Sequence, residues 1–232
     1  MTQQTRRERI RTATIAEIKE TARRHMAEKG AAALSLRAIA RDMGMTSPAL
    51  YRYFASRDNL VTALILDAYN SLADALEEAR ANSPPDDYKQ GMLNTGMAYW
   101  DWAMSHPQDY TLIFGTPIPG YEAPAELTAP AAQRAFDVFA SQLEAADRAN
   151  KLNPAPVYAD PPPALQAQLQ AWADEFGYTA STPVLYLALS GWGRLHGLIL
   201  LVIFHHLDAI LENSRDLYWA ELLAMLDQSG IK

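Results

Sequence analysis

The stretch MGMTSPALYRYFASRDNL, residues 43–60, decides the fold because it combines side chains that seldom share one short segment. Leu50 and Phe54 favour burial, whereas Tyr51 and Arg52 carry hydroxyl and guanidinium donors. A buried segment would not hold so many polar donors, and a solvated loop would not hold so many large apolar groups. The stretch therefore predicts a helix with one face packed inward and one face offered to a polar partner.

Two short helices are predicted around this stretch, over residues 36–43 and 47–54, joined by the residues GMT. Ser35 and Thr46 stand at the two N-cap positions, and Pro48 lies in a first turn, where its missing N–H does no harm. Two short helices joined in this way match a helix-turn-helix. In that motif the second helix enters the major groove of DNA and the first braces it.

The DNA contacts predicted for this motif use hydroxyls and guanidinium groups for phosphates and bases, and the Ala49 methyl for a thymine methyl. Arg57 adds positive charge at the start of the next helix, where N–H groups already attract phosphate. The residues predicted to contact DNA are Ser35, Arg37, Thr46, Ser47, Pro48, Ala49, Tyr51, Arg52, Tyr53 and Arg57.

The rest of the chain predicts an all-α fold, because apolar residues recur at helical spacing and no stretch alternates convincingly with period two. Helices are expected over 9–29, 57–81, 86–105, 107–115, 131–149, 161–177, 181–212 and 214–229. The proline-rich stretches 116–130 and 153–163 are expected to be irregular. We expect a helix-turn-helix domain over 9–56 and a larger helical domain over 57–232, which begins with the connecting helix 57–81.

Charge is distributed unevenly along the chain. Residues 1–60 carry 12 Lys and Arg against 6 Asp and Glu, whereas residues 61–232 carry 8 against 21. A basic head on an acidic body favours a polyanionic partner for the head, although a basic helix can also be merely solvated. The absence of cysteine excludes disulfides and thiolate metal sites. The N-terminus lacks a secretory h-region, and the longest apolar run, 198–204, is too short for a membrane span, so a cytoplasmic protein is expected.

These residues resemble the TetR family of transcriptional regulators. The resemblance covers about residues 9–72: the first helix ending in AEKG, then LSLRAIARDMGMTSPALYRYFASRDNL, and the helix that follows. The family usually has Lys before an acidic residue at the start of the fourth helix, where this chain has Arg57-Asp58. The resemblance implies a homodimer built through its last two long helices, palindromic double-stranded DNA as partner, and a small-molecule cavity in the C-terminal domain.

A second resemblance lies in SGWGRLHGLILLVIFHHL, residues 190–207. It is similar to the regulatory-domain subclass named for its Trp, His and Gly, which match Trp192, His196 and Gly197. Glycines in this helix indicate either close helix packing or room for a ligand, and His196 is either a ligand contact or a satisfied core histidine. The residues predicted to bind the ligand are Met92, Gly96, Tyr99, Trp100, Phe139, Trp192 and His196. Those predicted at the dimer interface are Leu198, Leu201, Val202, His205, Tyr218, Leu222 and Met225.

The leading hypothesis is a ligand-released repressor that requires no cofactor or metal. Adjacent His205 and His206 point about 100° apart on a helix, which disfavours a shared metal. The alternative is a constitutive or activating DNA-binding protein whose C-terminal domain binds another protein. An enzyme is disfavoured because the sequence has no catalytic triad pattern, metalloprotease motif or phosphate-binding glycine loop.

Overall fold

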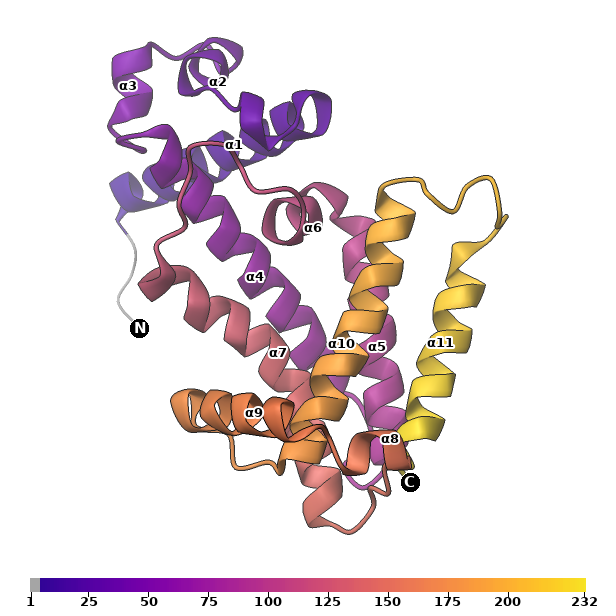
Figure 1. Ribbon diagram of the computed structural model, residues 1–232. Helices are drawn as coiled ribbons and strands as arrows, with labels where there is room; N and C mark the ends of the chain where they lie inside the picture. Colours follow the sequence, from indigo (N-terminus) through magenta and orange to yellow (C-terminus); the bar gives the residue numbers. More distant parts are fainter. Residues whose placement is uncertain (1–4) are drawn as a thin grey trace. The chain divides into compact units, whose positions relative to one another are not determined.

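The computed structural model describes residues 5–232, and its regular elements over that range are all helices, which confirms the all-α prediction (Figure 1). The helices of the N-terminal part are α1 (Arg6–Lys29), η1 (Ala31–Ala33), α2 (Leu36–Asp42), α3 (Ser47–Tyr51) and α4 (Arg57–Ala81). The remaining helices are α5 (Tyr88–Ser105), α6 (Pro107–Phe114), α7 (Ala125–Arg148), α8 (Pro156–Ala159), α9 (Pro163–Phe176), α10 (Thr182–Ile203) and α11 (Ser214–Ser229).

The chain folds into two compact units. The first contains the chain up to Tyr69 together with His106–Pro130, and the second contains Asn70–Ser105 together with Ala131–Lys232. The long helices α4 and α7 each contribute one end to each unit. The N-terminal helices thus share their unit with α6 and the proline-rich stretch that follows it.

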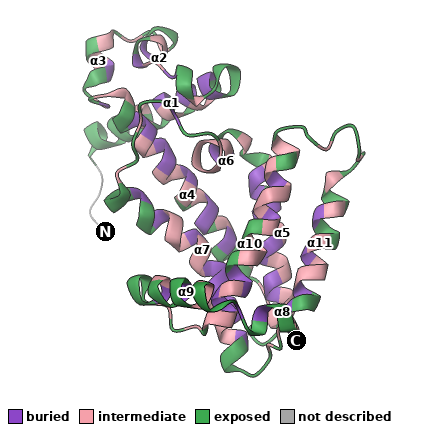
Figure 2. Ribbon diagram, viewed as in Figure 1, coloured by how far each residue is buried: buried purple, intermediate pink, exposed green. Residues whose placement is uncertain are grey.

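The first unit is built on α1, whose start is fixed by a capping box between Thr5 and Glu8. Gly30 ends α1 with φ of +76°, a backbone conformation that disfavours any side chain. The apolar stripe of α1 is buried against α2, α3 and the first turns of α4, as the buried faces in Figure 2 show. The largest fully buried side chains of this core are Ile18, Ile39, Leu50, Leu60 and Leu64.

Helix α6 is held to α1 by an ion pair that is partly withdrawn from solvent. Nε of Arg23 donates to both oxygens of Asp109, at 2.9 and 3.0 Å, and Asp109 is only 5% exposed. Lys19 of α1 pairs with Asp67 of α4 at 2.8 Å. These contacts hold α6 and α4 to α1 within the first unit.

In the second unit, α10 and α11 pack against each other and against α5. The hydroxyl of Tyr218 donates to the carbonyl of Gly96 at 2.7 Å, and Tyr218 is fully buried. A Cβ at Gly96 would lie 2.7 Å from the Leu222 side chain, so glycine is what permits α11 to approach α5 so closely. Helix α9 covers the start of α10 through Leu169 and Leu185.

Several helix ends differ from the sequence predictions. The third helix ends at Tyr51 rather than residue 54, and α10 ends at Ile203 rather than residue 212, because the chain turns and His205 adopts φ of +60°. Helix α7 begins at Ala125, six residues early, since Pro130 is tolerated inside it at the loss of one backbone hydrogen bond. The expected irregular stretch 153–163 contains the short helix α8.

Helix α10 is unusually apolar. By length and composition it is the one helix of the described chain that could cross a membrane, although a core helix of a soluble protein meets the same criteria. Its charged residue Arg194 is paired with Glu221 of α11 at 2.5 Å, which fits packing inside a protein.

Candidate DNA-binding surface and ligand cavity

Helix α3 is anchored by one face and leaves its other face accessible. Leu50 is fully buried in the core of the first unit, which fixes the orientation of the helix. Thr46 occupies the N-cap position but its side chain makes no capping hydrogen bond, so its hydroxyl is not consumed there. The predicted contact residues on and beside α3 that are exposed are Thr46, Pro48, Tyr51 and Arg52, and those that are half-buried are Ser47, Ala49 and Tyr53.

The bracing helix α2 places two further predicted residues beside α3. The hydroxyl of Ser35 accepts from the N–H of Ala38 at 3.5 Å and so caps α2, while Arg37 in its first turn is exposed. The N–H of Met45 donates to the carbonyl of Ala40 at 2.8 Å, which closes the turn between α2 and α3. The turn is therefore a fixed element that sets the angle at which α3 is presented.

Arg57, which is predicted to contact phosphate, also makes hydrogen bonds within its own chain. Its Nε donates to the carbonyl of Leu34 at 3.2 Å, and its Nη2 donates to those of Ala31 and Ala32 at 3.3 and 3.2 Å. A guanidinium so placed satisfies carbonyls at the end of η1 and ties the start of α4 to the turn before α2. The position of Arg57 at a helix start does not reveal these hydrogen bonds, and its phosphate contact stays a prediction.

Replacing Arg57 by Ala is expected to destabilise the first unit by about 1–3 kcal/mol, because three carbonyls lose a charged donor. Thermal unfolding measures this effect. Arg41→Ala is the matched control, since the Arg41 side chain is 80% exposed. An Arg57→Ala protein that melts like wild type and yet binds DNA weakly would instead favour the phosphate contact.

Sequence reasoning missed Arg11 as a neighbour of the recognition helix. Its guanidinium lies over the ring of Tyr53, 5.3 Å from the ring centroid, in a cation–π contact. Tyr53 thus holds a cation of α1 next to the end of α3. The two residues are 42 positions apart, so no local pattern indicates their contact.

A second missed contact joins α1 to the end of α2. Nε2 of His25 lies 2.6 Å from Oδ2 of Asp42, and His25 is only 6% exposed. The hydrogen bond from His25 holds the pKa of the Asp42 carboxyl below its usual value. This pair stabilises the packing of α1 on α2, the helix that braces α3.

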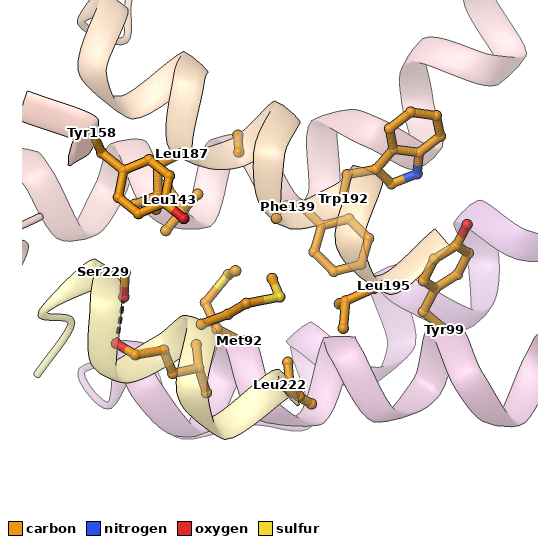
Figure 3. A pocket seen from close by; sticks show the side chains of 14 residues that line it. Met92, Tyr99, Phe139, Leu143, Tyr158, Leu187, Trp192, Leu195, Leu222 and Ser229 are labelled. Carbon is orange, nitrogen blue, oxygen red and sulfur yellow. Dashed lines mark hydrogen bonds between the residues drawn. The ribbon is translucent and has the colours of Figure 1, made fainter. Parts of the chain in front are cut away.

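The second unit contains a cavity among α5, α7, α8, α10 and α11, shown in Figure 3. Its volume is about 40 Å³, well below the roughly 300–1,000 Å³ of most small-molecule pockets. The residues lining it are Met92, Tyr99, Phe139, Leu143, Tyr158, Leu187, Ala188, Gly191, Trp192, Leu195, Leu222, Met225, Leu226 and Ser229. A lining that is mostly apolar with a few polar groups is typical of small-molecule sites.

The polar groups of the cavity lie toward its two ends. In Figure 3, Tyr99 and Trp192 stand toward one end, and Tyr158 and Ser229 toward the other. The hydroxyl of Tyr99 lies 3.2 Å from Nδ1 of His196, whose ring stacks on Trp192 with centroids 4.9 Å apart. The Ser229 hydroxyl donates to a backbone carbonyl at 2.7 Å.

The structure brings four of the seven predicted ligand residues to the cavity, namely Met92, Tyr99, Phe139 and Trp192. Gly96 instead meets Leu222 and Tyr218, and Trp100 packs on the Tyr218 ring with centroids 4.7 Å apart. His196 does not line the cavity, but it contacts two residues that do.

The residues predicted at the dimer interface fall into two groups. Leu201 and His205 are exposed and Leu198 and Val202 are half-buried, so these remain accessible. Tyr218 and Leu222 belong to the interior of their own chain, since Tyr218 is fully buried and Leu222 is 2% exposed, whereas Met225 is half-buried and lines the cavity. For Tyr218 and Leu222 the sequence pattern showed an apolar helix face without showing that α5 covers it.

Sequence reasoning also missed lining residues from segments with weak local signals. Tyr158 comes from the short helix α8, in a proline-rich stretch with no periodicity. Ser229 is the last residue of α11. Gly191 carried a signal, because a helix glycine indicates space for a neighbour, and a Cβ there would lie 2.8 Å from the terminal methyl of Met225.

The histidine beside the cavity predicts a pH dependence of stability. Burial lowers the pKa of His196 below its ordinary value of about 6.5, so the folded protein holds it neutral. As pH falls below about 6.5, the unfolded chain gains a proton that the folded chain does not, and stability decreases. His196→Gln should remove part of the loss between about pH 6.5 and 5, as measured by urea unfolding. An unchanged pH profile in this variant would contradict the assignment.

Comparisons with known proteins agree on one family. Residues 18–64 match the profile described as bacterial regulatory proteins of the tetR family, and residues 92–226 match a tetracyclin repressor-like C-terminal domain. The chain is 35% identical over 189 residues to the HTH-type transcriptional regulators Rv1816 of Mycobacterium tuberculosis and Mb1846 of Mycobacterium bovis, covering 82% of this chain and 80% of each relative.

Solved structures show the same relationship. A crystal structure of a regulatory protein, SCO4313, is similar with a TM-score of 0.80 and 40% identity, covering 96% of this chain and all of that one. A regulator of the tetR family from Rhodococcus RHA1 has a TM-score of 0.66 at 18% identity, covering 94% and 97%, and shows the shared fold. The resemblance to the Trp-His-Gly subclass stays a prediction. The helix-turn-helix, the helical C-terminal unit and these matches together show that the chain belongs to the TetR family of transcriptional regulators.

Proposed function

We propose that the protein is a cytoplasmic homodimeric repressor that binds a palindromic operator and leaves it when a small molecule occupies the cavity of the second unit. The observation that supports this most is the presence, in one chain, of an anchored helix with accessible donors and of a largely apolar cavity. One feature serves DNA and the other serves a ligand.

The DNA-binding part of the proposal rests on α3 and its surroundings. Tyr51 is 43% exposed, and Arg52 beside it is exposed as well. Leu50, on the opposite face of α3, is buried in the core and so fixes the rotation of the helix about its axis. Arg37 from α2 and Arg11 from α1 add cations near the same surface. Fixed cations and hydroxyls around one short helix suit phosphate contacts on either side of a major groove.

The dimer part rests on the uncovered face of α10. Leu189, Gly193, Gly197 and Leu201 recur every fourth residue, and the two leucines are 39% and 40% exposed. A Cβ at either glycine would meet nothing within 4 Å, so this chain leaves the space beside them open. An apolar helix face with small residues at its centre suits close packing against the same face of a second copy.

The coupling part follows the chain from the cavity to the head. Met92 and Tyr99 of α5 line the cavity, and α5 ends at Ser105, two residues before α6 begins. Asp109 of α6 is bound to Arg23 of α1. A ligand that displaces α5 would therefore pull on α6 and, through this ion pair, on α1. Coupling of this kind is worth about 1–3 kcal/mol, or about 5–150-fold in operator affinity.

The proposal is tested by fluorescence anisotropy on an operator selected by the protein itself, while compounds from a small-molecule library are added. A compound that raises the melting temperature and lowers operator affinity about fivefold or more supports ligand release. If every compound that raises the melting temperature leaves operator affinity unchanged, release is contradicted. The small cavity volume is the one observation that favours the second candidate, a regulator whose C-terminal domain binds another protein.

A further inference from the structure

The cavity has no charged lining residue that could neutralise a charge on a bound ligand. Among the 14 described residues that line it there is no Asp, Glu, Lys or Arg. The cations on the neighbouring helices are already paired: Lys89 of α5 with Asp227 at 3.0 Å, and Arg194 of α10 with Glu221 at 2.5 Å. A carboxylate or ammonium group inside would lose its hydration without gaining a partner, which is strongly unfavourable.

The walls of the cavity differ in how easily they move. The aromatic end is fixed by ring contacts: Tyr99 meets Phe139 with centroids 6.0 Å apart, and Trp192 meets Phe136 at 6.4 Å. The middle is formed by methionine, and Figure 3 shows Met92 between the two ends. Methionine is unbranched and changes conformation at low cost, so this part can yield to a ligand.

Met225 fills a space that a glycine of α10 leaves open. Its terminal methyl lies over Gly191, where a Cβ would be only 2.8 Å away, so the side chain occupies space that the glycine leaves open. A void of about 40 Å³ holds no ligand of ordinary size unless such side chains withdraw. Withdrawal of methionines opens a narrow passage between the two ends, whereas a broad ring system would also require the aromatic walls to separate.

We infer that the cavity takes an uncharged, slender and flexible apolar chain with at most a hydroxyl or carbonyl at one end, and that it rejects carboxylates and rigid polycycles. This inference rests on the proposed function for its biological meaning, since the molecule would be the effector. The polar end groups of the cavity, Tyr99 at one end and Tyr158 with Ser229 at the other, suit a single uncharged hydrogen-bonding group.

Isothermal titration calorimetry with three probes tests the inference on the full-length protein: 1-decanol, decanoate and pyrenemethanol. We expect 1-decanol to bind one molecule per chain, about tenfold or more tightly than either other probe. Decanoate binding as tightly as 1-decanol would overturn the charge argument. Pyrenemethanol binding as tightly would overturn the shape argument, and binding of none of the three would overturn the inference as a whole.

Two variants report whether the methionines open the cavity. Met92→Leu combined with Met225→Leu keeps volume and apolarity but stiffens the middle, and should weaken 1-decanol binding about tenfold. Met104→Leu is the matched control, because Met104 lies on α5 but does not line the cavity, and it should bind 1-decanol like wild type. Equal binding by the double variant and wild type would contradict the role of the methionines.

The same titration repeated in the presence of operator DNA separates this inference from the proposed function. If 1-decanol binds as expected and the operator is released, both the ligand class and the proposed release are supported. If it binds and the operator stays bound with unchanged affinity, the ligand class stands and the proposed release fails. If the operator is bound normally and 1-decanol does not bind, the ligand class fails while DNA binding stands.

Discussion

Replacing Tyr51 and Arg52 together by Ala is expected to lower operator affinity roughly 100-fold or more. Each contact to phosphate or base is worth about 1–3 kcal/mol, and a dimer loses the pair twice. Both side chains are exposed and their removal leaves the Leu50 anchor intact, so the fold should persist. Fluorescence anisotropy on the selected operator measures the loss, and thermal unfolding verifies the fold.

The salt dependence of the same variant gives a second, independent reading. Loss of one arginine–phosphate contact per protomer should reduce the slope of log affinity against log salt by about 2 for the dimer. Arg24→Ala is the matched control, because Arg24 is also an exposed arginine but lies near the C-terminal end of α1. If Arg24→Ala reduced affinity and slope as much as the double variant does, α3 would not be the surface that contacts DNA.

Replacing Leu189 and Leu201 together by Glu is expected to separate the dimer and to lower operator affinity about 1000-fold. Two carboxylates per chain would be buried in an apolar interface, at a cost of several kcal/mol. A monomer reads only one half-site, so it loses the affinity that comes from binding two half-sites at once. Sedimentation velocity at micromolar concentration reports the association state.

Ile210→Glu is the control for this interface. Ile210 is an exposed apolar residue, 73% accessible, but it lies beyond the end of α10 in the turn region before α11. This variant should remain dimeric and bind DNA normally. A Leu189→Glu, Leu201→Glu protein that stays dimeric would show that α10 does not form the interface.

Local sequence signals predicted the fold well where a helix is both capped and periodic. Helix α4 runs over Arg57–Ala81 as predicted, with the Ser56 hydroxyl accepting from the N–H of Asn59 at 3.1 Å. Helix α11 also has its predicted bounds, and Asn213 is its N-cap. The length of α10 was overestimated, because the apolar pattern of the sequence continues beyond Ile203, where the helix ends.

The residues of the candidate sites could be predicted from the sequence only where the type of side chain is enough to indicate what it contacts. The exposed face of α3 followed from residue types on a short helix whose opposite face is apolar. The hydrogen bonds of Arg57 within the chain could not be predicted in this way, because their acceptors are backbone carbonyls 23 to 26 residues away. Tyr218 and Leu222 show the same limit: an apolar helix face predicts burial, but only the packing of α5 shows that the burial occurs within the chain.

Selection of bound DNA from a random duplex library tests the central claim most directly, because it presupposes neither an operator nor an effector. The account predicts enrichment of one inverted repeat whose two half-sites are centred about one helical turn, or a multiple of it, apart. It also predicts that the enriched duplex binds two copies of the chain and that binding weakens steeply with salt. Recovery of no common sequence, or of a single half-site bound by one chain, would contradict it.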